Sequence, residues 1–556
     1  MVYKQIFQWE KIMKVVIIGG VAGGASCAAR LRRLSEEAEI VLFERGENIS
    51  YANCGLPYYL GGVIQEESAL TVASPALLQN RFRIDVRVRS EVVAIDRDAH
   101  TVTVHTPEGE YKESYDKLVL TPGASPKTFG LSGEGVFTLR DVRDTLAIDR
   151  YLKETGAKEV LVAGGGFIGV EMAENLTHRG LKVTLAEFAP QIMPPFDPEL
   201  ALLLSDALEK GGVNVRTDAG VKAIEKQGDA LIVTFTDGSK AQTGAVVLAL
   251  GVAPETALAK AAGLQIAENG GIAIDERMCT SDPDIFAAGD AVSVLGANGK
   301  ETLVPLAGPA NRQGRSVAQN LLGGSETNGK RVLGASVVRA FGTVGACVGQ
   351  NEKQLKRDGT AYHKIYTFPL SHAGYYPGGT SIAMKLLYDE KGSILGAQAV
   401  GSEYVEKQID VISTVIKLGG TVHDLAELEL CYAPPFNSAK SPVNMLGFVA
   451  ENELSGLCPM MTPDELTKDT FLLDVRNPQE LLTVGEFPNA VNIPLDVLRE
   501  RLGELPKDRP IAVACMVGLR GYIATRILRR HGFDAVDLSG GYRAYALLKR
   551  AGLVKR

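Results

Sequence analysis

Lys14-Val15-Val16-Ile17-Ile18-Gly19-Gly20-Val21-Ala22-Gly23-Gly24 is the stretch that decides the fold of this 556-residue chain. The run up to Ile18 predicts a buried β-strand, and the glycines predict a tight turn. A helix from Ala25 to Leu34 and a strand from Glu39 to Phe43, ending at Glu44, are expected next. Strand, glycine turn, helix, strand and terminal acid are the arrangement of a dinucleotide-binding unit.

In such a unit the glycines let the backbone approach a pyrophosphate at the helix N-terminus, and the acid accepts hydrogen bonds from a ribose. The stretch departs from the GxGxxG pattern at its second glycine, where Val21 stands. Taken alone, it is equally compatible with a glycine-rich turn that binds nothing.

The same unit recurs about 145 residues later. A strand over residues 159–163 leads into Gly164-Gly165-Gly166-Phe167-Ile168-Gly169, a helix is expected over 170–179, and a strand over 182–186 ends at Glu187. Here the GxGxxG pattern is complete. Two such units imply two dinucleotides, the minimum for moving a hydride between carriers.

Glu187 bears on the choice of cofactor. A carboxylate suits a free ribose 2′-hydroxyl and repels a 2′-phosphate, and a tenfold preference needs only ~1.4 kcal/mol. We therefore expect NADH, with NADPH less favoured. The alternative is a solvated carboxylate at the end of a strand.

Another apolar strand is followed by an acid, Asp290, in the stretch Asp284-Ile285-Phe286-Ala287-Ala288-Gly289-Asp290-Ala291. The Asp290 carboxylate can bond a polyol chain, or it can cap a helix. The phrases Leu118 to Gly123 and Val246 to Gly251 are parallel apolar strands, each closed by a glycine turn.

One cysteine lies just beyond the first unit, in Ser50-Tyr51-Ala52-Asn53-Cys54-Gly55-Leu56-Pro57-Tyr58-Tyr59. A dithiol enzyme would place a second cysteine five residues later, where Tyr59 stands. Cys54 must therefore pair with a group from outside its own loop. The seven cysteines contain no CxxC pair, which argues against a disulfide framework and a zinc site and favours a reducing cytoplasm.

Composition excludes several classes of protein. The net charge of −7 gives no basic footprint for nucleic acid, and no apolar run reaches the ~20 residues of a membrane span. Residues 1–12 lack the apolar core and cleavage site of a signal peptide, and Met13 is an alternative start of the native protein.

The last ~95 residues form a separate module. A strand over 510–514 runs into Cys515-Met516-Val517-Gly518-Leu519-Arg520 and a helix expected over 521–531. A cysteine between a strand end and a helix N-terminus meets unpaired N–H groups and the positive helix end, which favour a thiolate and can hold an anion. Arg520 adds a cation.

These phrases, in this order, resemble the FAD-dependent pyridine nucleotide–disulfide oxidoreductases over residues 13 to 450. Ser50 to Tyr58, with Ser371-His372-Ala373-Gly374-Tyr375-Tyr376-Pro377-Gly378 and Cys431-Tyr432-Ala433-Pro434-Pro435-Phe436, looks most similar to the coenzyme A–disulfide reductases. The resemblance to that branch implies that Cys54 is the single active-site cysteine. It also implies a homodimer, in which Tyr375 and Tyr432 of one subunit assist the thiol chemistry of Cys54 in the other. The tyrosines are alternatively interface aromatics.

The C-terminal module resembles a rhodanese domain through Asp474-Val475-Arg476, the six-residue loop and Gly540-Gly541-Tyr542-Arg543. The resemblance implies a persulfide sulfur on Cys515. The alternative is an inactive rhodanese fold used for docking.

The resemblance assigns the following residues to the two dinucleotides: Gly19, Val21, Ala22, Gly23, Gly24, Glu44, Arg45, Ser50, Asn53, Gly123, Gly164, Gly166, Phe167, Ile168, Gly169, Glu187, Gly251, Gly289 and Asp290. Coenzyme A is expected as substrate or ligand. Arg30 and Arg33, with Arg32 between them, could meet its phosphates, or they belong to a solvated helix face.

The predicted fold class is α/β, with two Rossmann-like domains, an α+β dimerisation domain and a C-terminal α/β rhodanese domain. The expected boundaries are 13–145 and 266–330 for the FAD domain, 146–265 for the NAD domain, 331–450 for dimerisation, 451–462 for a linker and 463–556 for the rhodanese module.

The predicted function is an NADH-dependent flavoprotein reductase of CoA disulfide, CoA persulfide or polysulfide, coupled to sulfur transfer. Electrons would pass to a Cys54 mixed disulfide. One alternative is an NADH oxidase or peroxidase that cycles a cysteine sulfenic acid. The other is a redox-sensing flavoprotein without turnover.

Overall fold

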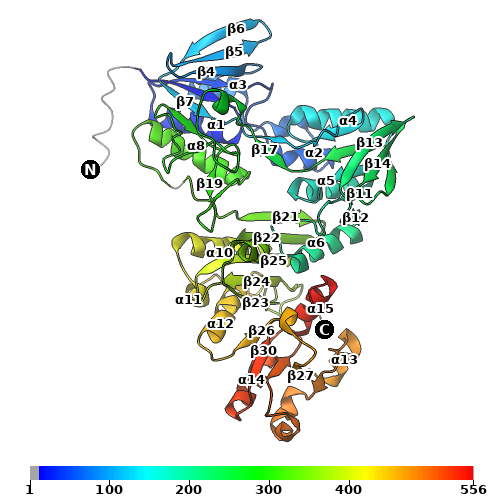
Figure 1. Cartoon of the computed structure of the whole chain (residues 1–556). Helices are drawn as coiled ribbons and strands as arrows, with labels where there is room; N and C mark the ends of the chain where they lie inside the picture. Colours follow the sequence, from blue (N-terminus) through cyan, green and yellow to red (C-terminus); the bar gives the residue numbers. More distant parts are fainter. Residues whose placement is uncertain (1–11, 328, 555–556) are drawn as a thin grey trace. The chain divides into compact units, whose positions relative to one another are not determined.

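The computed structural model describes residues 12–327 and 329–554, so nearly all of the N-terminal segment discussed above lies outside the described residues (Figure 1). The chain forms two compact units. Unit 1 comprises the described residues up to Ala189 together with Gly212–Gly334. Unit 2 comprises Pro190–Gly211 together with the described residues from Ala335 onward. The segment 190–211, expected within the NAD domain, thus groups with unit 2.

Unit 1 contains two five-stranded parallel sheets that repeat one plan. In the first, β1 (Lys14–Ile18) lies between β7 (Lys117–Leu120) and β2 (Glu39–Phe43), with β18 (Ile285–Ala287) and β3 (Asp85–Arg87) at the edges. Helices α1 (Ala22–Leu34) and α8 (Ala307–Leu321) pack against each other beside it. All but the first residue of β1 are buried, as the apolar run predicts.

The second sheet has β10 (Glu159–Ala163) between β11 (Lys182–Ala186) and β16 (Ala245–Leu248). Its outer strands are β12 (Asn214–Arg216) and β9 (Val136–Thr138), and its helices are α4 (Val142–Thr155) and α5 (Phe167–His178). The unit also contains two three-stranded antiparallel sheets: β4 (Glu91–Asp96), β5 (Thr101–Thr106) and β6 (Gly109–Ser114); and β13 (Val221–Gln227), β14 (Ala230–Phe235) and β15 (Lys240–Thr243).

Helices α1 and α5 each begin three residues earlier than the sequence predicts. The first turn of each helix contains glycine, which has a low helix propensity, so the sequence pattern hides that turn.

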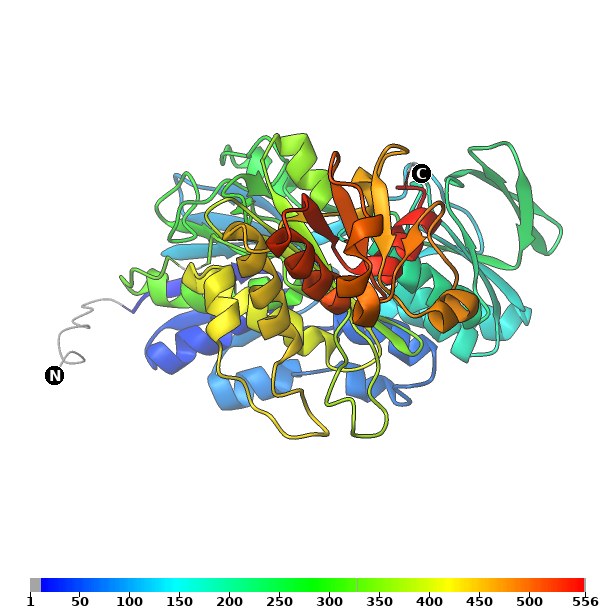
Figure 2. The ribbon, with the colours of Figure 1, turned by 90° about the horizontal axis from the view of Figure 1, so that it is seen from below.

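Unit 2 begins with an antiparallel sheet in the order β21 (Ser336–Ala340), β22 (Thr343–Gly349), β25 (Ile394–Gly401), β24 (Ala383–Tyr388) and β23 (His363–Thr367). Its helices are α6 (Pro198–Lys210), α9 (Glu352–Asp358), α10 (Val405–Leu418), α11 (Val422–Glu427) and α12 (Pro442–Leu454). Two loops, over residues 368–382 and 428–441, project side by side from this part (Figure 2).

The C-terminal part of unit 2 is a parallel sheet in the order β26 (Met460–Met461), β30 (Ala535–Leu538), β29 (Ile511–Ala514), β27 (Phe471–Asp474) and β28 (Val491–Asn492). Helices α13 (Pro478–Val484), α14 (Leu519–Arg530) and α15 (Gly541–Arg550) accompany it. The expected linker contains structure, because α12 ends within it and β26 pairs with β30.

The predicted α/β class, with two Rossmann-like sheets, a mixed third part and a parallel C-terminal sheet, is confirmed. Across the part of the chain that is described, no helix combines the length and the apolar character needed to cross a bilayer.

Candidate functional site

The two glycine turns of unit 1 have the same close-packed geometry. Gly19 has φ +98°, and a Cβ on Gly24 would lie 1.8 Å from the Gly19 carbonyl oxygen. In the second turn Gly164 has φ +107°, and a Cβ on Gly169 would lie 1.8 Å from the Gly164 oxygen. Only glycine fits at these positions. Val21 is tolerated because its φ is −99°, which is ordinary for a residue with a side chain.

The acid at the end of each second strand is tied back to its glycine turn. Glu44 Oε2 accepts a hydrogen bond from the Gly20 N–H at 2.9 Å. Glu187 Oε2 accepts one from the Gly165 N–H at 2.6 Å. Each carboxylate is therefore held beside the helix N-terminus where a dinucleotide's ribose and pyrophosphate bind.

Asp290 follows β18, in the sheet whose centre is β1. Its half-buried carboxylate has no hydrogen-bond partner among residues 12–327 and 329–554. Burial raises its pKa, against the opposing charge of Arg140. A half-buried acceptor without a partner is suited to a hydroxyl-rich ligand.

These observations fit one dinucleotide in each half of unit 1. The other residues expected at these sites lie on the same turns and their neighbours: Ala22 and Gly23 in the first turn of α1, Phe167 and Ile168 in that of α5, Gly123 and Gly251 in positive-φ turns after β7 and β16, and Gly289 beside Asp290. Arg45 pairs with Glu255 at 3.2 Å, and Asn53 is exposed.

Cys54 lies in the 3-10 turn Asn53–Gly55, directly before α2 (Leu56–Leu60). The Ser50 N–H donates to the Gly20 carbonyl at 2.8 Å, which fixes this segment to the first glycine turn. The thiol is exposed, yet partial desolvation and the carboxylates of Glu171 and Asp290 raise its pKa. Each effect disfavours the thiolate, so these residues of unit 1 do not activate Cys54 by themselves.

Glu171 is a residue of this site that the sequence patterns did not indicate. It lies on α5, and burial together with the charge of Glu174 raises its pKa to about 7, against a hydrogen bond with Tyr58. A group that titrates near neutral pH thus lies close enough to Cys54 to influence its thiol. The available signal was its position two residues after the last glycine of the GxGxxG pattern.

Tyr375 and Tyr432 come together at the ends of the two projecting loops of unit 2. Their hydroxyl groups are hydrogen-bonded to each other, and both side chains are exposed. The hydrogen bond to Tyr432 raises the pKa of Tyr375. Two exposed phenols joined by a hydrogen bond can donate to or accept from a third group brought to them.

The arginines of α1 divide into two kinds. Arg32 is buried, and its guanidinium donates to the carbonyls of Ser35, Glu36, Phe82 and Arg83. It is therefore a structural residue. Arg33 is exposed and Arg30 is half-buried, and a role for these two in binding phosphate stays a prediction.

A buried ion cluster joins distant segments of unit 2. Asp197, Glu199 and Glu352 come close enough to resemble a metal site, but the Lys385 ammonium lies 2.9, 2.7 and 2.7 Å from their oxygens. Burial alone would lower the pKa of Lys385, and the carboxylates with Tyr366 raise it well above its ordinary value. The cation of this cluster is thus a lysine.

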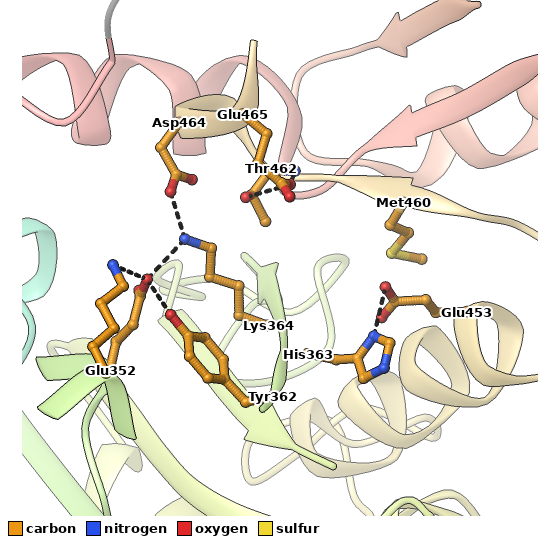
Figure 3. A pocket seen from close by; sticks show the side chains of 10 residues that line it. Glu352, Tyr362, His363, Lys364, Glu453, Met460, Thr462, Asp464 and Glu465 are labelled. Carbon is orange, nitrogen blue, oxygen red and sulfur yellow. Dashed lines mark hydrogen bonds and ion pairs between the residues drawn. The ribbon is translucent and has the colours of Figure 1, made fainter. Parts of the chain in front are cut away.

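A pocket beside this cluster connects the two sheets of unit 2. Lys364 Nζ lies 3.1 Å from Glu352 and 2.6 Å from Asp464, and it stands between them in the pocket (Figure 3). His363 contacts Glu453 on the opposite side at 3.3 Å. Every charged group named here is paired, so we interpret these residues as ion pairs that hold the two sheets together.

Cys515 is buried at the end of β29, in the loop that opens α14. The Gly518 N–H donates to its sulfur at 3.2 Å. Arg520 interacts with the same sulfur and also forms two hydrogen bonds of 2.6 Å with Glu480. A loop N–H and an arginine thus both lie at this sulfur, and the role of Cys515 as a sulfur carrier stays a prediction.

Three family matches cover most of the chain. The pyridine nucleotide-disulphide oxidoreductase family matches residues 13–314, its dimerisation domain matches 341–442, and the rhodanese-like domain matches 462–548. The chain belongs to the pyridine nucleotide-disulphide oxidoreductases. It is an FAD-dependent reductase of this family, and it uses a nicotinamide cofactor.

Relatives narrow the comparison further. The chain is 35% identical to a coenzyme A disulfide reductase of Staphylococcus aureus over 442 residues, which cover 79% of this chain and all of the relative. A solved structure of reduced CoADR-RHD from Bacillus anthracis is 45% identical, with a TM-score of 0.95, and covers 98% of this chain and 100% of that one.

Two further solved structures are similar to this chain and differ in their own activities. An NAD-dependent persulfide reductase from A. fulgidus is 37% identical, with a TM-score of 0.89, over 96% of this chain and 100% of that one. A water-forming NADH oxidase from Lactobacillus brevis is 27% identical, with a TM-score of 0.75, over 80% of this chain and 99% of that one.

Proposed function

We propose that this protein is an NADH-dependent reductase of CoA disulfide and CoA persulfide, in which a rhodanese module handles the sulfane sulfur. The observation that carries the proposal is the coverage of the comparisons. The persulfide reductase and CoADR-RHD match 96% and 98% of the chain, whereas the NADH oxidase matches 80%. The oxidase fold therefore has no counterpart for about a fifth of this chain.

FAD and NADH would bind at the two glycine turns. Glu44, Asp290 and the first turn would hold FAD, and Glu187 with the second turn would hold NADH. When bound, FAD supplies the relay that moves two electrons from the nicotinamide to a thiol. At ~4 Å and an effective dielectric of ~20, a 2′-phosphate charge would meet the Glu187 carboxylate with a repulsion of about 4 kcal/mol, so we infer a preference for NADH.

Cys54 would act as the nucleophile. Its thiolate attacks one sulfur of the substrate, the substrate S–S bond breaks, and a mixed disulfide with Cys54 forms. The released thiolate needs a proton. Because unit 1 disfavours the Cys54 thiolate, the positive contribution must come from a bound cofactor, the substrate or another subunit.

Tyr375 and Tyr432 would supply this contribution from the second subunit of a homodimer, to Cys54 of the partner subunit. Their exposed, mutually bonded hydroxyls can donate to a thiolate and protonate a leaving one. Arg30 and Arg33 would bind phosphates of coenzyme A. Cys515 would carry the persulfide sulfur, with Arg520 beside it. We assign these roles to the domains with the boundaries proposed from the sequence. The proposed location is the reducing cytoplasm.

A direct experiment compares electron acceptors. NADH oxidation by the purified, FAD-loaded protein is measured with oxygen alone, CoA disulfide and CoA persulfide. We expect either CoA substrate to be consumed at least tenfold faster than oxygen. Oxygen as the fastest acceptor would replace this proposal with an NADH oxidase, and no turnover with any acceptor would favour a redox sensor.

A further inference from the structure

Three arginines lie around the Cys515 loop, and two of them are paired with carboxylates. The Arg476 guanidinium is buried and bonds to Asp474 at 2.6 Å. Arg520 is held by both oxygens of Glu480. Arg543 differs from both, because in the described part of the chain no carboxylate lies within ion-pair distance of it.

Arg543 is attached to the Cys515 loop through its backbone. Its N–H donates to the Met516 carbonyl at 3.1 Å, and the neighbouring Tyr542 N–H donates to the Cys515 carbonyl at 2.7 Å. A Cβ on Gly541 would lie 2.3 Å from the Cys515 oxygen, so α15 starts in direct contact with the loop. The N-termini of α14 and α15 therefore meet at this loop.

The field at this junction is positive. Helix N-termini carry partial positive charge, and acidic residues normally offset it in the first turn. Neither α14 nor α15 has an acid there, and each has an arginine instead. Glu480 offsets Arg520 from outside the helix. Arg543 keeps its charge and its exposure, which makes it the unbalanced cation of the junction.

The Arg543 side chain leaves the rhodanese module and contacts the first sheet of unit 2. Its Nη1 donates to Ser381 Oγ at 2.7 Å, and Ser381 pairs with Leu370 at the base of the loop that carries Tyr375. A second hydrogen bond joins the rhodanese module to this sheet: the Tyr366 N–H donates to Ser539 Oγ at 2.8 Å. The guanidinium thus stands at the seam between the Cys515 loop and the Tyr375 loop.

We propose that Arg543 binds a phosphate group of the thiol that exchanges sulfur with Cys515. The proposal rests on the proposed role of Cys515 as a sulfur carrier. Arg520 interacts with the sulfur of Cys515. A ligand whose reacting sulfur lies at Cys515 would therefore reach Arg543 with an anionic group distant from that sulfur. The planar fork of arginine binds phosphate through two parallel hydrogen bonds.

The exchange itself is balanced without an external oxidant. The carrier thiolate attacks the terminal sulfur of the Cys515 persulfide, an S–S bond forms on the carrier, and the S–S bond to Cys515 breaks. The persulfide anion takes the proton of the carrier thiol before the attack, this proton moves with the terminal sulfur, and Cys515 leaves as a thiolate. Arg543 takes no part in these bonds and acts only in binding.

The experiment uses the full FAD-loaded chain with Cys54→Ser, so that reduction at Cys54 does not consume the sulfur. Cys515 is loaded with polysulfide, and loss of its extra sulfur is followed by intact-protein mass spectrometry. The acceptors are CoA, pantetheine, which has the same thiol arm without phosphates, and glutathione, whose anions are carboxylates. Arg543→Gln is compared with Arg530→Gln, which removes the same charge from the exposed C-terminal end of α14.

We expect Arg543→Gln to raise the CoA concentration for half-maximal transfer about tenfold and to leave pantetheine and glutathione unchanged. Arg530→Gln should change none of them, and added salt should weaken the use of CoA in the parent protein alone. Equal losses with CoA and pantetheine would mean a structural role for Arg543, and no loss with CoA would refute the proposal. Absence of transfer from the parent protein to every acceptor would instead refute Cys515 as a carrier.

Discussion

Cys54 and Cys515 each lie a few residues before an α-helix, but the charged groups around them differ in sign. Cys54 is exposed, and partial desolvation together with two carboxylates raises its pKa. Cys515 is buried and has a loop N–H and an arginine at its sulfur. The chain thus places two N–H donors at the second thiol and leaves the first to depend on what binds beside it.

This difference matches the two proposed tasks. A sulfur carrier must hold an anionic persulfide between encounters, so its charge has to be stabilised at all times. A redox cysteine next to a cofactor needs its thiolate only when substrate and cofactor are in place. Exposure without activation protects Cys54 from side reactions such as oxidation of a free thiolate.

The largest expected effect comes from removing the first thiol. Cys54→Ser should lower the rate of CoA disulfide reduction by at least a thousandfold, because Cys54 is the thiol that would form the mixed disulfide. NADH should still reduce the bound FAD, which is measured by flavin absorbance under anaerobic conditions. Cys279→Ser, a half-buried cysteine of the same unit, is the control and should keep full activity. Retained turnover in Cys54→Ser would move the redox centre elsewhere.

The second substitution tests whether the tasks are separate. Cys515→Ser should leave the reduction of CoA disulfide within twofold of the parent protein and reduce sulfur transfer from polysulfide at least a hundredfold. The assay follows thiol release and sulfane sulfur in parallel. Cys458→Ser, a buried cysteine at the entrance to the same module, serves as the control. If both activities survive Cys515→Ser, the module is a passenger.

A smaller effect should come from Glu171, whose carboxylate contributes to the difference between the two cysteines. Above pH 7 its carboxylate is charged and disfavours the Cys54 thiolate, so Glu171→Gln should lower the pKa of Cys54 and speed alkylation severalfold at pH 8. At pH 5.5 Glu171 is already protonated, and the two proteins should react alike. Rates of iodoacetamide alkylation across this pH range provide the measurement. A difference of equal size at both pH values would exclude the charge as its cause.

The sequence predicted the two dinucleotide units because their signals are local. Strand, glycine turn and acid lie within about 30 residues, and the steric demand on Gly24 and Gly169 is visible in the spacing alone. Cys54 stood out for a similar reason, since a missing partner is a local fact. The tyrosines came from family resemblance, and the structure adds that their hydroxyls meet.

Contacts between distant segments could not be predicted in this way. Glu171 lies 117 positions after Cys54, and nothing in either neighbourhood indicates that one acts on the other. The Lys385 cluster draws on residues between positions 197 and 385, and a buried lysine in a strand is an exception to ordinary patterning. Arg543 has a neighbour in Ser381 that only the fold supplies.

Helix α6 has a consequence for how this polypeptide can be divided. It follows the second dinucleotide-binding strand in the chain, yet its N-terminal residues Asp197 and Glu199 neutralise Lys385 in unit 2. A fragment that starts at Ala335 would bury an ammonium with two of its three carboxylates missing. A fragment that contains the rhodanese module and the antiparallel sheet before it therefore also needs α6. Any gene fusion that recombines these modules has to keep α6 together with that sheet.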